Sequence, residues 1–143
     1  MDKVYVTGIG VISAIGNNVE ENLAHLRNSK SGIGKANNFN SKYTASLNFG
    51  EVKLTNNELK GKANAIDKKG VSRTVLLAFV AIQEAIDHAG LSANDLTSFR
   101  TGFISSSTVG GMCNTDELYA DANLKGEPSE FVSSYGGGEH TLR

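Results

Sequence analysis

The stretch "RTVLLAFVAIQEAIDHA", residues 73–89, is the strongest structural signal in the 143-residue chain. Ser72 precedes it as a plausible N-cap, and Gly90 follows it, where a glycine often ends a helix. Its apolar positions lie on more than one face and are Val75, Leu76, Leu77, Phe79, Val80, Ile82 and Ile86. A helix that is apolar nearly all round is predicted to be buried between two layers, so it needs partners on both sides.

The elements predicted around this helix make an α/β domain that looks unfinished. Residues 3–9 and 100–107 favour strands, because β-branched and aromatic residues end at glycines or serines. Residues 18–28 predict a helix with Asn17 and Glu20 as a cap-like start, and 114–125 predict a weaker one. The polar interval 29–71 is interpreted as a long, irregular surface excursion. Two strands and one buried helix do not complete a layered domain.

Composition excludes several classes of protein. The chain is 39% hydrophobic and 20% charged, which is typical of a soluble globular protein. A net charge of −1 argues against a general nucleic-acid binder. No apolar run approaches the roughly 18 residues of a membrane span, and the first residues do not resemble a secretory signal. With the single cysteine Cys113 as well, we expect a cytoplasmic protein that binds neither nucleic acid nor membrane.

The glycines of "VYVTGIGVISAIGNN", residues 4–18, pose a choice between cofactor binding and a structural bend. Gly8 and Gly10 begin a G-x-G-x-x-G pattern, but Ser13 stands where the third glycine belongs. In a dinucleotide fold the helix opens directly on the glycines, whereas here it is predicted to begin near Val19. We favour the structural bend, and a nucleotide-dependent oxidoreductase is kept as an alternative.

No catalytic constellation stands out among the remaining residues. Cys113 could be a thiol nucleophile at a helix start, but a small residue packed in a turn is the favoured interpretation. Ser105, Ser106 and Ser107 lack the turn that presents a hydrolase nucleophile, and a flexible loop is favoured for Gly136, Gly137 and Gly138 over an anion site. The histidines have no neighbours at metal-ligand spacing; they are His25, His88 and His140.

A cluster of basic residues lies between Leu59 and Arg73. It has five positive charges against Asp67 alone, and its members are Lys60, Lys62, Lys68, Lys69 and Arg73. A solvated face is one interpretation. The other is a docking patch for an acidic partner, whose association rate the positive charge would raise.

Four stretches together resemble the N-terminal part of the β-ketoacyl-[acyl-carrier-protein] synthases, the elongating condensing enzymes of the thiolase-like superfamily. They are "VYVTGIGVISAIGNNVEENLAHLRNSKSGIG" (4–34), "GEV" (50–52), "AIQEAIDHAGL" (81–91) and "TGFISSSTVGG" (101–111). The resemblance covers residues 3 to about 112 well and is loose through 113–143. It implies the N-terminal part of an αβαβα layered fold, incomplete in this chain, with residues 1–143 forming one partial domain.

The resemblance also implies an activity. Such acyltransferases condense an acyl thioester with malonyl-carrier protein, losing carbon dioxide, in fatty-acid or polyketide-type synthesis. They use a cysteine in a T-A-C-S-like turn and two histidines. Cys113 does not match that turn, and no histidine here matches the catalytic pair, so this chain alone is expected to be inactive. No metal or redox cofactor is implied, since the acyl group is carried on phosphopantetheine.

Binding roles follow from the resemblance residue by residue. Val109 in "STVGG" matches a position that lines the acyl-chain pocket. Lys68, Lys69 and Arg73 match the region that docks the acidic acyl carrier protein, and the family implies a homodimer. The competing hypothesis is a non-catalytic, half-length module that binds carrier protein or pairs with a second subunit.

Overall fold

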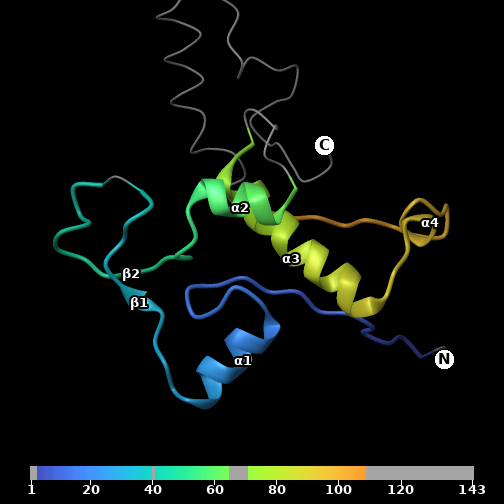
Figure 1. Cartoon of the computed structure of the whole chain (residues 1–143), viewed down its shortest axis with the longest axis horizontal. Coiled ribbons are helices and arrows are strands. Elements are labelled where there is room, and N and C mark those ends of the chain that lie inside the picture. Colours follow the sequence, from blue (N-terminus) through green and yellow to red (C-terminus); the bar gives the residue numbers. More distant parts are fainter. Residues whose placement is uncertain (1–2, 40, 65–70, 109–143) are drawn as a thin grey trace, which may run out of the picture.

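The computed structural model describes residues 3–39, 41–64 and 71–108, and Figure 1 shows their arrangement. The chain passes through helix α1, a hairpin of strands β1 and β2, and helices α2, α3 and α4. Their bounds are Val19–Arg27, Ile33–Gly34, Phe49–Gly50, Asn56–Lys62, Arg73–Ala89 and Ala93–Leu96. The described residues therefore form a small mixed α/β structure in which α3 is the longest element.

Helix α3 begins and ends where its sequence predicts. The Ser72 hydroxyl accepts a hydrogen bond from the Val75 amide at 3.3 Å. Gly90 is left-handed, with φ of 66°, and its amide donates to the Asp87 carbonyl at 3.1 Å. The Leu91 amide donates to Ile86, which completes a Schellman motif. Local sequence alone specifies both ends of this helix.

Burial of α3 on every side is not what the structure shows. Val75, Leu76 and Val80 are buried, whereas the other predicted core positions are half-buried; these are Leu77, Phe79, Ile82 and Ile86. Among the described residues α2 and the N-terminal segment pack on α3, and the only sheet is the two-stranded hairpin. The prediction of two covering layers stays a prediction, because the described residues supply no second layer.

The interval 29–71 is not an irregular surface excursion throughout, which corrects the sequence-based interpretation. It contains the antiparallel hairpin, with Ile33 opposite Gly50, and it contains α2. Leu59 of α2 is 0% exposed and joins Leu76 and Val80 in the core. A polar helix with one buried leucine gives almost no periodic signal, which is why α2 is missed.

The sequence does contain one signal that could have predicted α2, a capping box at its start. The Thr55 hydroxyl accepts from the Glu58 amide at 3.3 Å, and the Glu58 carboxylate accepts from the Thr55 amide at 2.7 Å. The spacing T-x-x-E just before a leucine is the sequence mark of such a box. The box fixes the N-terminus of α2, and Leu59 of this helix packs against Leu76 of α3.

The N-cap of helix α1 lies one residue later than predicted. Asn18, rather than Asn17, is the N-cap, and its side-chain oxygen accepts from the Glu21 amide at 2.7 Å. The Glu21 carboxylate in turn accepts from the Asn17 amide at 2.7 Å. Two adjacent asparagines offer the same chemistry, so the sequence could not choose between them.

The two predicted strands, 3–9 and 100–107, form no ladder with any described residue. Both are largely extended and solvent-exposed; Val4 is 95% exposed and Ile104 is 97% exposed. A strand forms only when a neighbour accepts its backbone hydrogen bonds, and the described residues bring none alongside. The predicted helix 114–125 lies outside the described residues.

Candidate functional site

The glycine-rich segment lies directly against α3. A Cβ placed on Gly10 would collide with the Ala81 carbonyl and would come within 2.8 Å of the Ala85 nitrogen. A Cβ on Gly8 would lie 2.7 Å from the Ala89 side chain. The glycines therefore allow a close backbone approach to a helix. They have a structural role in this packing, and the predicted bend stays a prediction.

Side chains from α3 and α1 hold this segment by its backbone. The Glu84 carboxylate accepts from the Val11 amide at 2.9 Å and from the Val19 amide, at the start of α1, at 2.7 Å. A carboxylate at a helix N-terminus is also favoured by the helix dipole. Sequence analysis missed Glu84, since nothing local marks a residue whose partners lie 73 and 65 positions away.

Two of the three histidines have structural partners. The His88 ring accepts from the Ile9 amide at 3.1 Å, and the His25 ring contacts the Ile15 carbonyl. His140 lies outside the described residues. In the part of the chain that the structure describes, no three His, Cys, Asp or Glu side chains gather as a metal site would require.

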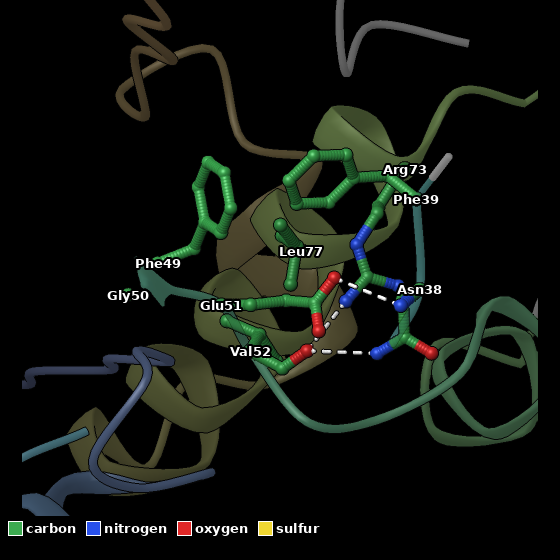
Figure 2. A pocket seen from close by; sticks show the side chains of 8 residues that line it. All are labelled: Asn38, Phe39, Phe49, Gly50, Glu51, Val52, Arg73 and Leu77. Atoms are coloured by element: carbon green, nitrogen blue, oxygen red, sulfur yellow. Dashed lines mark hydrogen bonds between the residues drawn. The ribbon is translucent and has the colours of Figure 1, made fainter. Parts of the chain in front are cut away.

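The candidate functional site is a pocket of about 340 Å³ between the hairpin and the start of α3, shown in Figure 2. We call it the hairpin pocket. Its eight lining residues are Asn38, Phe39, Phe49, Gly50, Glu51, Val52, Arg73 and Leu77. They include "GEV", one of the four stretches that carry the family resemblance.

A buried carboxylate organises the polar part of the hairpin pocket. Glu51 is 8% exposed, and its carboxylate accepts from the Asn37 amide at 2.8 Å and the Asn38 amide at 2.9 Å. The Asn38 side chain donates to the Val52 carbonyl at 3.1 Å. Buried charge is tolerated when hydrogen bonds replace water, and the two backbone amides do this for Glu51.

Arg73, one of the predicted docking residues, is the first residue of α3 and reaches into the same pocket (Figure 2). Its guanidinium donates to the Val52 carbonyl at 2.7 Å and to the Asn56 side-chain oxygen at 2.8 Å. These bonds tie α3 to the segment that joins β2 and α2 and to the first residue of α2. Arg73 therefore has a structural role that sequence reasoning missed, and its docking role stays a prediction.

The remaining walls of the hairpin pocket are apolar. The rings of Phe39 and Phe49 meet edge to face, with centroids 5.0 Å apart and planes at 89°. Leu77 of α3 lies between the rings and the polar floor in Figure 2. None of the eight lining residues carries a hydroxyl, thiol or imidazole, and the one carboxylate, that of Glu51, is held by two backbone amides, so we treat the hairpin pocket as a candidate binding site.

Most of the other predicted site residues lie outside the described residues: Lys68, Lys69, Val109 and Cys113, with the glycines 136–138. Of the basic cluster, Lys60 and Lys62 stand in the last turn of α2, and Arg73 is the first residue of α3. The serines 105–107 are in the exposed extended segment. Of the predicted docking residues only Arg73 lies among the described residues, so the docking patch stays a prediction.

Comparison with known proteins identifies the family of this chain. The β-ketoacyl synthase N-terminal domain matches residues 1–138, so this chain belongs to that family. Family membership assigns the thiolase-like fold, and the described residues form a small mixed α/β part of it. No helix among these residues combines the length and hydrophobicity needed to cross a membrane.

Individual relatives agree with the family match. The chain is 34% identical over 117 residues to 3-oxoacyl-[acyl-carrier-protein] synthase 1 of Haemophilus influenzae, which is 80% of this chain and 27% of the relative. It is 38% identical over 95 residues to the Escherichia coli K12 synthase 1, covering 64% and 22%. It is 35% identical over 114 residues to synthase 2 of Staphylococcus aureus N315, covering 77% and 26%. The chain spans about a quarter of the length of these relatives.

Proposed function

We propose that this chain provides the N-terminal part of a 3-oxoacyl-[acyl-carrier-protein] synthase, an acyltransferase of fatty-acid or polyketide-type synthesis. The observation that carries the proposal is the family match over residues 1–138, with relatives of that name at 34–38% identity. The reaction joins an acyl thioester to malonyl-carrier protein. A covalent cysteine route splits it into acyl transfer, which releases the carrier thiol, and carbon–carbon bond formation with loss of carbon dioxide.

The chain by itself is proposed to lack this activity. The T-A-C-S-like motif occurs nowhere in the 143 residues. Within the described residues, His25 and His88 contact backbone groups of the glycine-rich segment. The catalytic cysteine and histidines of the proposed enzyme must therefore lie in sequence other than these residues. No metal or redox cofactor is part of the proposal, because the substrate arrives on a phosphopantetheine arm.

The proposed partner is acyl carrier protein, docked by Lys68, Lys69 and Arg73, with Val109 lining the acyl pocket. The relatives are acyl-carrier-protein synthases by name, and the five basic residues between Leu59 and Arg73 supply positive charge for an acidic carrier; both support the carrier assignment. We extend the proposal to a cytoplasmic homodimer, on the basis of the family resemblance. Since Arg73 also holds Val52 and Asn56, the two lysines give the cleaner test of docking.

The test is carrier binding by a Lys68→Glu/Lys69→Glu variant. Charge reversal should weaken the affinity for acyl carrier protein about tenfold or more at low salt, since opposite charges then become like charges. Fluorescence anisotropy with labelled carrier protein measures this, and Lys30→Glu, at the end of α1, is the matched control. Unchanged affinity of the double variant at low ionic strength would refute the docking assignment.

A non-catalytic docking module is the second candidate, favoured by the missing cysteine motif. The sequence that follows residue 143 separates the two functions, because a T-A-C-S-like stretch there would favour the synthase and a stop codon would favour the module. For either function, intact-mass measurement of the same mixtures, prepared with acylated carrier protein, tests whether the chain alone is acylated. The chain should bind the carrier without gaining an acyl group. Acylation of the chain that disappears in Cys113→Ser would show that Cys113 is a nucleophile after all.

A further inference from the structure

The hairpin pocket has no role in the proposed chemistry. It nevertheless combines apolar walls with a chain segment, residues 33–64, of net positive charge. We propose that it takes one apolar side chain of an acidic protein partner, so that docking has an uncharged anchor beside the charged contacts. This inference rests on the proposed function, because the partner is identified with the acyl carrier protein. It adds a second kind of contact to the predicted lysine patch.

The apolar walls are available to a partner. Phe39 is 45% exposed, although its ring is fixed by the edge-to-face contact with Phe49. Phe49 and Leu77 are half-buried and complete the wall (Figure 2). Covering exposed aromatic and aliphatic carbon removes it from water, which favours association.

The polar floor of the pocket is already organised. The carboxylate of Glu51, the Asn38 side chain and the Arg73 guanidinium all have hydrogen-bond partners within the chain. These bonds join the hairpin to α3, so the walls are held apart before any partner arrives. A preformed pocket avoids part of the ordering cost of association.

The same floor argues against a charged ligand head in the pocket. Glu51 and Arg73 contribute one negative and one positive charge, so the pocket has no net formal charge. An anionic head drawn to Arg73 would also meet the Glu51 carboxylate. An uncharged apolar side chain, the size of a leucine, methionine or phenylalanine, suits this lining better than a fatty-acid carboxylate does.

Charge around the pocket selects an acidic partner. Residues 33–64 contain two glutamates against five lysines, which are Lys35, Lys42, Lys53, Lys60 and Lys62. Both glutamates are engaged internally: Glu51 by the Asn37 and Asn38 amides, and Glu58 by the Thr55 amide and hydroxyl. Residues 33–64, which carry six of the eight lining residues, therefore have a net formal charge of +3, which favours and orients a negative partner.

The test compares two exposed aromatics of the same hairpin. Phe39→Ala should weaken binding of labelled acyl carrier protein by roughly tenfold, as removal of a central apolar contact does. Tyr43 is 50% exposed and does not line the pocket, so Tyr43→Ala should leave the affinity within about twofold. Phe39→Leu, which keeps an apolar side chain, should restore most of the affinity. The loss in Phe39→Ala should persist at high salt, unlike that of Lys68→Glu/Lys69→Glu.

A measurement on the unaltered chain keeps the proposal testable if Phe39→Ala fails to fold. Carrier protein should shift the methyl resonances of Leu77 and leave those of Leu23 on α1 unchanged. Equal binding by wild type and folded Phe39→Ala, or an unmoved Leu77 signal in the bound state, would overturn the anchor and leave the carrier role intact. No saturable binding by wild type would overturn the carrier assignment and the anchor together.

Discussion

Two regions of the molecule differ in where their backbone hydrogen bonds find partners. One is the corner where α2 meets α3, and the other comprises the two extended segments, 3–9 and 101–107. At the corner, Leu59 is 0% exposed and Leu76 is 1% exposed, and both helices close their own backbone hydrogen bonds. In the segments, Val4 and Ile104 are more than nine-tenths exposed, and no described strand pairs with either. A helix needs only its own residues to form, whereas a strand needs a neighbour.

Truncation of a core leucine should produce the largest loss of stability. A small loss would contradict the contrast between the helical corner and the extended segments. Leu76→Ala removes a side chain that contacts the α2 core, and it is expected to lower the free energy of unfolding by about 2–5 kcal/mol. Ile104→Ala, in the exposed segment, should change it by no more than about 0.5 kcal/mol. Urea denaturation followed by circular dichroism measures both. Comparable losses in the two variants would mean that residue 104 is packed in solution.

The junction between the two regions should be the next most sensitive point. Gly10→Ala forces a methyl group into the Ala81 carbonyl of α3, and overpacking of this kind costs about 1–3 kcal/mol. Gly61→Ala, in α2, meets nothing within 4 Å and should instead stabilise the chain by up to about 1 kcal/mol, because alanine favours a helix. The same denaturation experiment compares them. A neutral Gly10→Ala would show that the N-terminal segment does not lie on α3.

The smallest expected effect is the response of two helix caps to acid. It should differ between α2, which has a buried leucine, and α4, which has no buried residue. Hydrogen bonds from the Thr55 amide and hydroxyl lower the pKa of Glu58, and bonds from the Ser92 hydroxyl and amide lower the pKa of Asp95. A lowered folded-state pKa means that each cap stabilises its helix above the ordinary carboxyl pKa. That contribution is lost as pH falls through the lowered value.

Because Leu59 anchors α2 and no residue of α4 is buried, α4 should fray first as pH falls from 7 towards 3. Amide chemical shifts of Thr55 and Ser92 report the two caps. Glu58→Gln should flatten the acid response at Thr55, because a glutamine can make the same cap without titrating. An unchanged acid response in that variant would assign the transition to another group.

Local rules predicted the parts of the fold whose causes lie within a few residues. Ser72 and Gly90 mark α3 because a cap and a left-handed end act on adjacent amides and carbonyls. The structural role expected for Gly8 and Gly10 agrees with their close approach to α3. Helix α2 was missed although Thr55 and Glu58 carry a capping box, since the periodic apolar signal there is a single buried leucine.

The candidate site was predicted only in part, for a physical reason. Arg73 was singled out for its charge, which is visible in a sequence. Its bonds to Val52 and Asn56, and the burial of Glu51, join residues 14 to 21 positions apart and have no local signature. The roles of Lys68, Lys69 and Val109 come from the family pattern and stay predictions.

The sequence by itself determined the family, the presence of α1 and α3 and both ends of α3, because these depend on residue pattern and on hydrogen bonds between near neighbours. Only the tertiary structure decided which side of α3 is buried, how Glu84 binds both Val11 and Val19, and that Phe39 and Phe49 form a pocket with Leu77. These features depend on contacts between segments far apart in the chain. Such contacts exist only once the helices and the hairpin have packed together.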